Sequence, residues 1–447
     1  MLRTQKDRAG LVAVLLFGLL LLNPATVVPP STALAATTAA TATATAGQSS
    51  VSGQVTIEFW HGITGPDKEG LDLLIDKFNR LYAGKIRIQS TPIAWGEYYS
   101  KVVVAVAGGS PPDLGIIHRD RMPEVALQNV LRPLDDVFNA LGLTDDDFIG
   151  RISREGIYGG KRYGIPLDIH TLLLFYNEDH FDQAGLPGPP QRAAQFLDYA
   201  RKLTLDRNGD NQPDQWGTRF GIWGPQWYTA LRQMGGDYFG GENYTQVTVA
   251  DPPGRNALQY VVDLMFKHKV APPPEIWPDM FAGQVSMAVD GIWFLRQAQD
   301  LRNQGKVDLR VAKADRLYGD VAPAVWAGSH QFVIFRQPKD RPEKLQAMAT
   351  FIDFMSRNSA TWASFGQVAI RKDALATEEW RQLKDHQIIV QQQFVFFPPQ
   401  PWGTGLGIIE DIMNRALRER QPVESALEAG KKQLEVRIKE FREQLGI

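Results

Sequence analysis

The chain has 447 residues, enough for two or three ordinary domains, and its 44% hydrophobic and 22% charged content is that of a globular protein with a sizeable core. Its 48 basic residues against 50 acidic ones give a net charge of -2, which offers no electrostatic basis for binding nucleic acid or an anionic membrane. The absence of cysteine excludes disulfides, a thiol nucleophile, cysteine-bound metals and lipidation at a lipobox.

The N-terminal segment has the pattern of an export signal. Basic residues precede the apolar run Leu11–Leu22, and Ala33-Leu34-Ala35 fits the small-x-small cleavage pattern. The sequence therefore predicts a Sec signal peptide over residues 1–35 and a disordered Ala/Thr-rich linker over residues 36–53. An uncleaved signal-anchor is the alternative, because Leu11–Val28 is nearly long enough to span a bilayer. We expect an exported protein, periplasmic or at the cell surface, that is not a lipoprotein.

Strands and helices alternate at the start of the folded part. Hydrophobic periodicity predicts strands at Val55–Trp60, Ile86–Gln89 and Leu114–Ile117, with helices between them at Glu69–Tyr82 and Glu97–Ala107. This order is typical of a parallel α/β sheet, in which ligands bind beyond the carboxyl ends of the strands. Trp60, His61, Trp95, His118 and Arg119 lie at those ends, and we take Trp60, His61 and His118 as candidate binding residues.

Two polar residues accompany the next apolar strand, Thr171–Tyr176. Asp168 and His170 stand two residues apart, so a strand places them on the same face. We interpret them as binding residues; the alternative is a capping aspartate and a solvent-facing histidine. From Pro225 to Lys269 the pattern becomes rich in helices, which indicates a second lobe.

The segment Phe281–Trp293 is the most informative one. A helix end with a glycine stop leads into an apolar strand that delivers Trp293 just past Gly291. Glycine leaves the backbone open to a ligand, and an indole is a flat apolar face with one N–H donor. The pattern predicts contact with a flat ligand that is polar at its edges, such as a pyranose ring. A strand that ends on a core tryptophan is the alternative.

Four segments together resemble the family 1 extracellular solute-binding proteins of ABC importers, the maltose-binding-protein-like group. They are Ile57–Gly62, Gly160–Asn177, Phe281–Trp293 and the terminal helix from Pro422. The resemblance implies an α/β, type II periplasmic-binding fold with two lobes, each a mainly parallel sheet flanked by helices, joined by hinge strands. It places the N-lobe at residues 54–168 plus 329–375 and the C-lobe at 169–328 plus 376–447.

The resemblance also implies a function and a set of ligand-binding residues. The protein would capture a sugar or oligosaccharide between its lobes and deliver it to an ABC permease, as a monomer and without catalysis. The implied ligand-binding residues are Trp60, His61, His118, Asp168, His170, Trp227, Gly291, Trp293, Trp326, Gly328, Ser329 and Trp402, the last in a loop over residues 399–403. A secreted carbohydrate-active hydrolase and an anchored sugar sensor are the alternatives. A hydrolase needs two carboxylates about 5–10 Å apart, and Asp168 alone stands among these residues.

A polar loop indicates a metal site of a different kind. Asp206, Asn208, Asp210 and Asp214 place oxygen side chains at positions 1, 3, 5 and 9, a spacing that suits a structural Ca²⁺ ion. The bidentate glutamate of position 12 is missing, because Gly217 stands there. A metal-free polar turn is therefore the alternative, and no cofactor is required by the predicted function.

Overall fold

The computed structural model describes residues 53–150, 152–241, 244–398 and 402–445. The predicted signal peptide, and all of the predicted linker except residue 53, lie outside the described residues. No helix in the described ranges combines the length and the apolar character needed to cross a bilayer.

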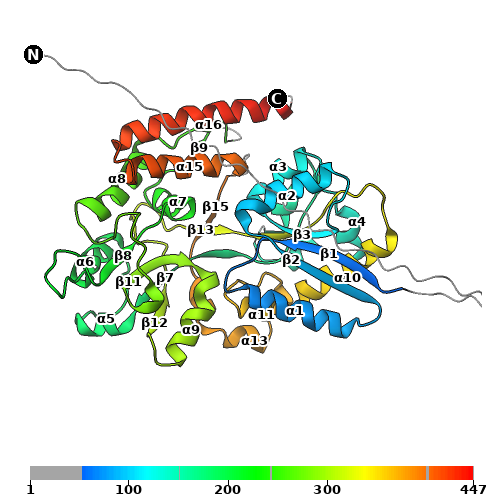
Figure 1. Cartoon of the computed structure of the whole chain (residues 1–447), viewed down its shortest axis with the longest axis horizontal. Coiled ribbons are helices and arrows are strands. Elements are labelled where there is room, and N and C mark those ends of the chain that lie inside the picture. Colours follow the sequence, from blue (N-terminus) through cyan, green and yellow to red (C-terminus); the bar gives the residue numbers. More distant parts are fainter. Residues whose placement is uncertain (1–52, 151, 242–243, 399–401, 446–447) are drawn as a thin grey trace, which may run out of the picture. The chain divides into compact units, whose positions relative to one another are not determined.

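The first of two large sheets has the strand order β2-β1-β3-β14-β6. Its strands are β1 (Val55–His61), β2 (Ile86–Pro92), β3 (Leu114–His118), β6 (Ile165–Pro166) and β14 (His330–Ile334). The helices grouped with it in Figure 1 are α1 (Lys68–Leu81), α2 (Trp95–Ala107), α3 (Met122–Leu127), α4 (Asp135–Ala140), α10 (Pro342–Arg357), α11 (Ser359–Ala363) and α13 (Glu378–Gln382). The short helices α12 (Lys372–Leu375) and α14 (Lys384–Ile389) flank α13 in the chain.

Both faces of this sheet are covered because its strands are apolar on both sides. Phe59 packs against Phe351 of α10 and Phe78 of α1 packs against the same ring, which builds a core on one face. Ile117 and Val333 belong to a separate core with Tyr98 of α2 on the other face. A parallel α/β arrangement needs such double coverage.

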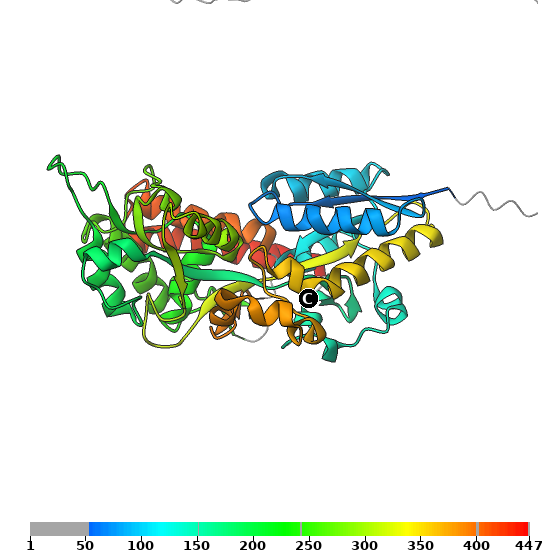
Figure 2. The ribbon, with the colours of Figure 1, turned by 90° about the horizontal axis from the view of Figure 1, so that it is seen from below.

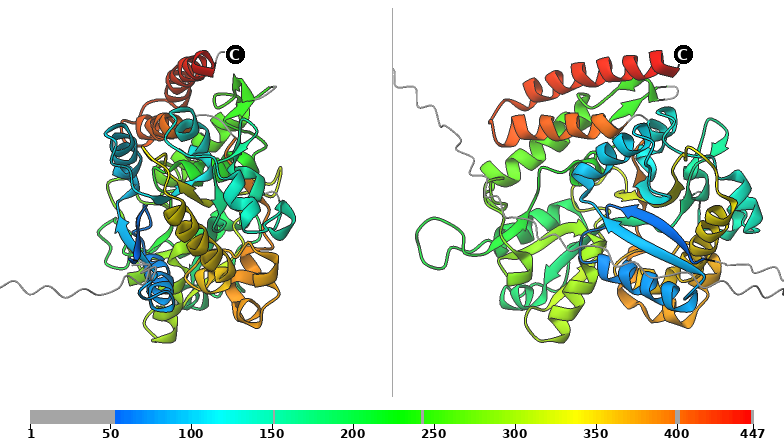
Figure 3. Two further views of the ribbon diagram at one scale, coloured as in Figure 1. Left: turned by 90° about the vertical axis from the view of Figure 1, so that its right-hand side faces the viewer. Right: turned by 45° about the vertical axis from the view of Figure 1, so that its right-hand side comes forward.

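The second sheet has the order β15-β13-β7-β11-β8, with β12 also paired to β7. Its strands are β7 (His170–Asn177), β8 (Trp216–Arg219), β11 (Val285–Gly291), β12 (Leu309–Ala312), β13 (Val325–Gly328) and β15 (Phe394–Phe396). The helices that accompany it are α5 (Glu178–Gln183), α6 (Ala193–Leu203), α7 (Gly224–Gln233), α8 (Pro252–Phe266), α9 (Leu295–Asn303), α15 (Trp402–Leu417) and α16 (Val423–Leu445). Helices α15 and α16 lie side by side, orange and red in Figure 3.

Short elements complete the described fold. They are the two-stranded pairs β4 (Ile157–Tyr158) with β5 (Lys161–Arg162) and β9 (Phe239–Gly240) with β10 (Gln246–Val247), and the single-turn 3-10 helices η1 (Arg119–Arg121), η2 (Asp145–Asp147), η3 (Ile152–Gly156), η5 (Met280–Ala282) and η6 (Ile292–Phe294).

The chain passes between the two sheets along nearly continuous strands. β6 of the first sheet leads through three residues into β7 of the second, and β13 of the second leads through Ser329 into β14 of the first. These crossing strands run through the middle of the fold (Figures 1 and 2). The two-lobed α/β fold expected from the sequence is confirmed.

The expectation of mainly parallel sheets is wrong. β14 pairs antiparallel with both β3 and β6, and β7 pairs antiparallel with β11, β12 and β13. The physical reason lies in the crossing strands, because a strand that arrives from the other sheet enters against the local strand direction. All strands of the first sheet fall within residues 54–168 and 329–375, although the lobe boundaries themselves stay a prediction.

One buried histidine far from the crossing strands should contribute to the loss of stability in acid. His386 of α14 is 1% exposed, and its Nε2 donates to the carbonyl oxygen of Ala363 at 2.7 Å. The ring is enclosed beside Trp380, so an imidazolium there would lose most of its hydration. Burial lowers the pKa of His386 to about 4.

The unfolded chain therefore binds a proton at this side chain between pH 6.5 and 4 while the folded chain does not, so stability falls as the pH falls through that range. The variant His386→Gln keeps an N–H donor but does not titrate. Between pH 7 and pH 4 we expect its free energy of unfolding to fall by about 3 kcal/mol less than that of the wild type. Urea unfolding at both pH values measures this. The surface variant His268→Gln is the control and should follow the wild type more closely; identical pH dependence in wild type and His386→Gln would contradict the prediction.

Candidate functional site

A cavity of about 460 Å³ lies between the two sheets, where the crossing strands meet. We call it the central cavity. It is lined by Ile63, Thr64, Gly65, Asp67, Trp95, His118, Asp120 and His330 from the first sheet and its helices, and by His170, Trp223, Pro225, Trp293, Trp326, Phe397 and Leu406 from the second. Its volume is in the range of small-molecule binding sites.

Four tryptophans supply most of the apolar wall. The ring centroid of Trp223 lies 5.7 Å from that of Trp293 and 5.9 Å from that of Trp326, both in edge-to-face geometry. Trp95 comes from the first sheet's side and lies parallel to His330, with 5.8 Å between the ring centroids. Flat apolar rings therefore border the cavity on both lobes.

Glycines hold three of the aromatic rings in place. A Cβ atom on Gly62 would lie 2.0 Å from the ring of Trp95, one on Gly291 would lie 2.1 Å from the ring of Trp293, and one on Gly328 would lie 2.2 Å from Nε2 of His170. Any side chain at these positions would displace the ring. Gly291 thus shapes the site by letting the indole of Trp293 lie against its backbone, where we expected the ligand itself.

Strand register brings three histidines together. His330 of β14 stands opposite His118 of β3, and His170 of β7 stands opposite Gly328, two residues before His330. The ring centroids are 4.3 Å apart for His170 and His330, 5.1 Å for His118 and His330, and 5.5 Å for His118 and His170. All three rings line the central cavity.

Asp168 supports two of these histidines from behind. Its carboxylate is fully buried and accepts hydrogen bonds from Nδ1 of His330 at 2.8 Å, from the backbone N–H of His330 at 3.0 Å and from Nε1 of Trp362 at 2.8 Å. Nδ1 of His170 lies 3.4 Å from the same carboxylate. Burial alone would raise the pKa of Asp168, but the charge of His330 and these hydrogen bonds hold it below its ordinary value.

The three histidines do not share one protonation behaviour. Burial lowers the pKa of His118 well below its ordinary value, and the neighbouring His330 and His170 lower it further. Burial also lowers the pKa of His170. For His330 the carboxylate of Asp168 outweighs burial and raises the pKa. His330 and Asp168 therefore form a buried ion pair, with two neutral imidazoles beside it.

Two carboxylates face the cavity itself. Asp67 precedes α1 and accepts a hydrogen bond from Nε2 of Gln367 at 2.8 Å, and Asp120 follows His118 in η1. Burial raises the pKa of Asp67 to about 6. Both residues offer acceptors to ligand hydroxyl groups.

The structure brings four of the residues nominated from the sequence into the cavity wall: His118, His170, Trp293 and Trp326. Asp168, Gly291, Gly328 and Ser329 are buried behind that wall. Ser329 accepts a hydrogen bond from Nε2 of Gln331 at 2.8 Å.

Three other nominated residues lie away from the cavity wall. His61 points into the first sheet, where its Nε2 lies 2.8 Å from Oγ of Ser90, and Trp60 packs on the core around Tyr98. Trp227 is 0% exposed, because the phase of helix α7 turns it toward the core and Tyr238, while Trp223 at the start of the helix reaches the cavity. Trp402 begins helix α15, where a loop was expected.

Sequence reasoning missed several lining residues, and some had a signal. The sequence places Trp95 at the expected binding edge, just past the second strand, but Trp95 is not among the nominated residues. Trp223 stands beside a glycine, a position where ligand-facing aromatic residues occur. Asp120 follows His118 by two residues. His330 had no local signal, because only the pairing of β14 with β3 places it opposite His118.

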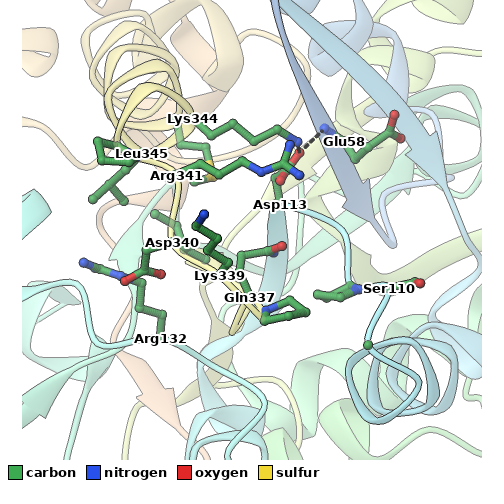
Figure 4. A pocket seen from close by; sticks show the side chains of 16 residues that line it. Glu58, Ser110, Asp113, Arg132, Gln337, Lys339, Asp340, Arg341, Lys344 and Leu345 are labelled. Atoms are coloured by element: carbon green, nitrogen blue, oxygen red, sulfur yellow. Dashed lines mark hydrogen bonds and ion pairs between the residues drawn. The ribbon is translucent and has the colours of Figure 1, made fainter.

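A second cavity of about 460 Å³ lies at the other end of the first sheet (Figure 4). Three of its charged side chains, Asp113, Lys344 and Arg132, are held in ion pairs. The Asp113 carboxylate accepts from Nζ of Lys344 at 2.6 Å and from the backbone N–H of Glu58 at 2.9 Å, and Arg132 is paired with Asp136 at 2.7 Å. Since it also lacks aromatic lining residues among the described ones, the central cavity is the better candidate site.

The predicted calcium loop is an exposed network of turns. Asp206 accepts from the backbone N–H groups of Gly209 and Asn211, at 2.7 and 2.8 Å. Asp210 accepts from the N–H of Gln212 at 2.8 Å, and Asp214 accepts from the N–H of Arg207 at 2.7 Å. These bonds satisfy several backbone N–H groups of the loop, and calcium binding stays a prediction.

Comparisons with known proteins agree with this architecture. The sequence model of the family described as bacterial extracellular solute-binding protein matches residues 64–362. The chain is similar to the sn-glycerol-3-phosphate-binding periplasmic protein UgpB of Pectobacterium atrosepticum, with 27% identity over 156 residues, which is 33% of this chain and 34% of the relative. The match thus spans about a third of that relative's length.

Solved structures share the fold over most of the chain. A solute-binding protein of an ABC transporter from Thermotoga lettingae, bound with α-D-tagatose, matches with a TM-score of 0.74 and 22% identity, covering 86% of this chain and 100% of that one. The maltose/maltodextrin-binding domain MalE from Bdellovibrio bacteriovorus, bound to maltotriose, matches with a TM-score of 0.73 and 18% identity, again covering 86% and 100%.

Two sheets joined by crossing strands, with a ligand-sized cavity between them, define a type II periplasmic-binding fold. Because the family match covers more than half of the sequence, the chain belongs to the bacterial extracellular solute-binding proteins.

The loop at residues 206–214 generates a prediction about calcium. If Ca²⁺ binds, it neutralises the charges of Asp206, Asp210 and Asp214, so added Ca²⁺ should raise the melting temperature and a chelator should lower it. Asp210→Ala should abolish both responses, and scanning calorimetry of the two proteins measures them. His118→Ala, whose substitution lies in the central cavity, is the control and should respond to Ca²⁺ as the wild type does. A melting temperature indifferent to Ca²⁺ and chelator would mean that the loop is a turn only.

Proposed function

We propose that this protein captures a sugar or oligosaccharide in the central cavity and delivers it to the permease of an ABC importer. The observation that carries the proposal is the pairing of aromatic walls with polar groups. Trp95, Trp223, Trp293 and Trp326 offer faces for the C–H surface of a pyranose, and Asp67 and Asp120 offer acceptors for its hydroxyl groups. Both structural neighbours were solved with a sugar bound, α-D-tagatose in one and maltotriose in the other, and this supports the same class of ligand here.

A third cavity, of about 480 Å³, adjoins the central cavity and favours a ligand longer than one ring. It shares Trp223 and Trp293 with the central cavity and continues to Trp277 and Arg219. Arg219 is fixed by an ion pair with Asp290 at 2.6 Å and lies 4.6 Å from the centroid of Trp277. An oligosaccharide could thus pass over the edge formed by Trp223 and Trp293.

Export and delivery complete the proposal. A Sec signal peptide over residues 1–35 would take the chain out of the cytoplasm, and the crossing strands would act as the hinge on which the lobes close over the ligand. We infer that the protein acts as a monomer and without catalysis.

A panel of mono- and oligosaccharides, screened by thermal shift and then by calorimetry, tests the function. A ligand with micromolar affinity at millimolar concentration should add roughly 4 kcal/mol of stability. Because Asp67 and Asp120 are two carboxylates in one cavity, a hydrolase is the second candidate. Chromatography of the bound sugar after long incubation separates the two, and we expect it unchanged. Product formed over many turnovers would favour the hydrolase.

Trp293 should be a main contact of the sugar. Trp293→Ala removes an aromatic face from both adjoining cavities, and we expect it to cost about 2 kcal/mol of affinity, or about 30-fold in Kd. Tyr82→Ala is a matched control, since it also removes a stacked ring, 4.4 Å from Phe78, but outside the cavities. Calorimetry with the best sugar of the panel measures both. Normal affinity in a folded Trp293→Ala protein would remove this residue from the site.

A further inference from the structure

We propose that His118, His170 and His330 form a binding site for a divalent transition-metal ion in the wall of the central cavity. One ring nitrogen of each histidine lies within 4.8 Å of those of the other two. Around Zn²⁺ the spacing between nitrogen ligands is about 3.4 Å, from a Zn–N distance of about 2.1 Å in tetrahedral geometry. Modest rotations of the rings would bring the three nitrogens to that spacing.

The hydrogen bonds of the three rings favour this use. In the described part of the chain, the side-chain hydrogen bonds of these rings all involve Nδ1. The Nδ1 atoms of His170 and His330 contact the carboxylate of Asp168, and Nδ1 of His118 lies 2.8 Å from the hydroxyl oxygen of Tyr99. Nε2 of each ring is then available to an ion, once His330 has released the proton that it carries in its ion pair with Asp168. Histidine ligands in metal sites are oriented in the same way, by a carboxylate or another polar group on the second nitrogen.

The charges around the cavity favour a cation. Asp168 lies directly behind two of the rings, and Asp67 and Asp120 line the same cavity. No lysine or arginine stands among the described lining residues, so the site does not have the composition of an anion site. Imidazole ligands suit Zn²⁺, Ni²⁺ and Cu²⁺ better than Ca²⁺ or Mg²⁺, which take oxygen ligands.

Three protein ligands leave one position of a tetrahedral ion open. The central cavity lies on that side, so a ligand oxygen could complete the coordination. The ion would also link the two lobes, because His118 and His330 belong to the first sheet and His170 to the second. The inference concerns the metal alone and does not depend on which solute the protein carries.

Titration of the chelator-treated protein with Zn²⁺, without any sugar, tests the proposal. We expect one equivalent to bind to the wild type and to His268→Ala, whose histidine lies outside the cluster. Loss of an outer partner costs 10–100-fold in such sites, so loss of a direct ligand in His118→Ala should weaken binding by more than about 100-fold. Since the titration uses the metal alone, a failed sugar screen leaves its result intact.

Spectroscopy and positioning variants make the test specific. With Co²⁺ in place of Zn²⁺, the wild type should show the visible absorption of a tetrahedral ion and His118→Ala should not. Tyr99→Phe, which keeps the ring and removes the partner of His118, should weaken Zn²⁺ binding by about 10-fold. No Zn²⁺ binding by the folded wild type would overturn the proposal, as would equal binding by His118→Ala and His268→Ala.

Discussion

One buried carboxylate holds the middle of this fold. Asp168 sits where the chain crosses from the first sheet to the second, and its partner His330 begins the strand that crosses back, 162 residues later. A third contact, from Trp362, ties the helix α11 to the same carboxylate. A charge with no exposed surface is stable only when such partners surround it. The position of both crossing strands, and therefore of His170 and His330 in the cavity, depends on this one group.

A second constraint on the cavity wall is that three of its rings need glycine beside them, because a Cβ atom there would overlap the ring. Because Trp95, Trp293 and His170 each lie against a backbone without a side chain, their rings are held by contact on one face and leave the other for the cavity. A ligand that meets such rings need not order them first, and this reduces the entropic cost of binding. Aromatic residues at the ends of elements thus form a firmly held part of the cavity wall.

The sequence predicted the parts of the fold that depend on local periodicity. β1, α1 and α2 were found within a residue or two, because one apolar face or alternation sets each of them. The position of Trp293 in the cavity wall could be predicted because the strand, the glycine and the indole are neighbours in the chain. Contacts between distant segments decide two further features. One is the phase of helix α7, which buries Trp227 and turns Trp223 to the cavity, and the other is the strand register that sets His330 opposite His118. No local pattern encodes them, so the histidine cluster could be seen only in three dimensions.

The place of β14 inside the first sheet has a consequence for the order in which the molecule is made. This strand lies between β3 and β6, and it is synthesised only after nearly the whole second sheet. The first sheet therefore cannot be completed until β14 has been synthesised. The contacts that complete it join distant parts of the sequence and are slow to form. For the export proposed above, such a delay would be an advantage, because the late synthesis of β14 would keep the first sheet incomplete while the chain is exported.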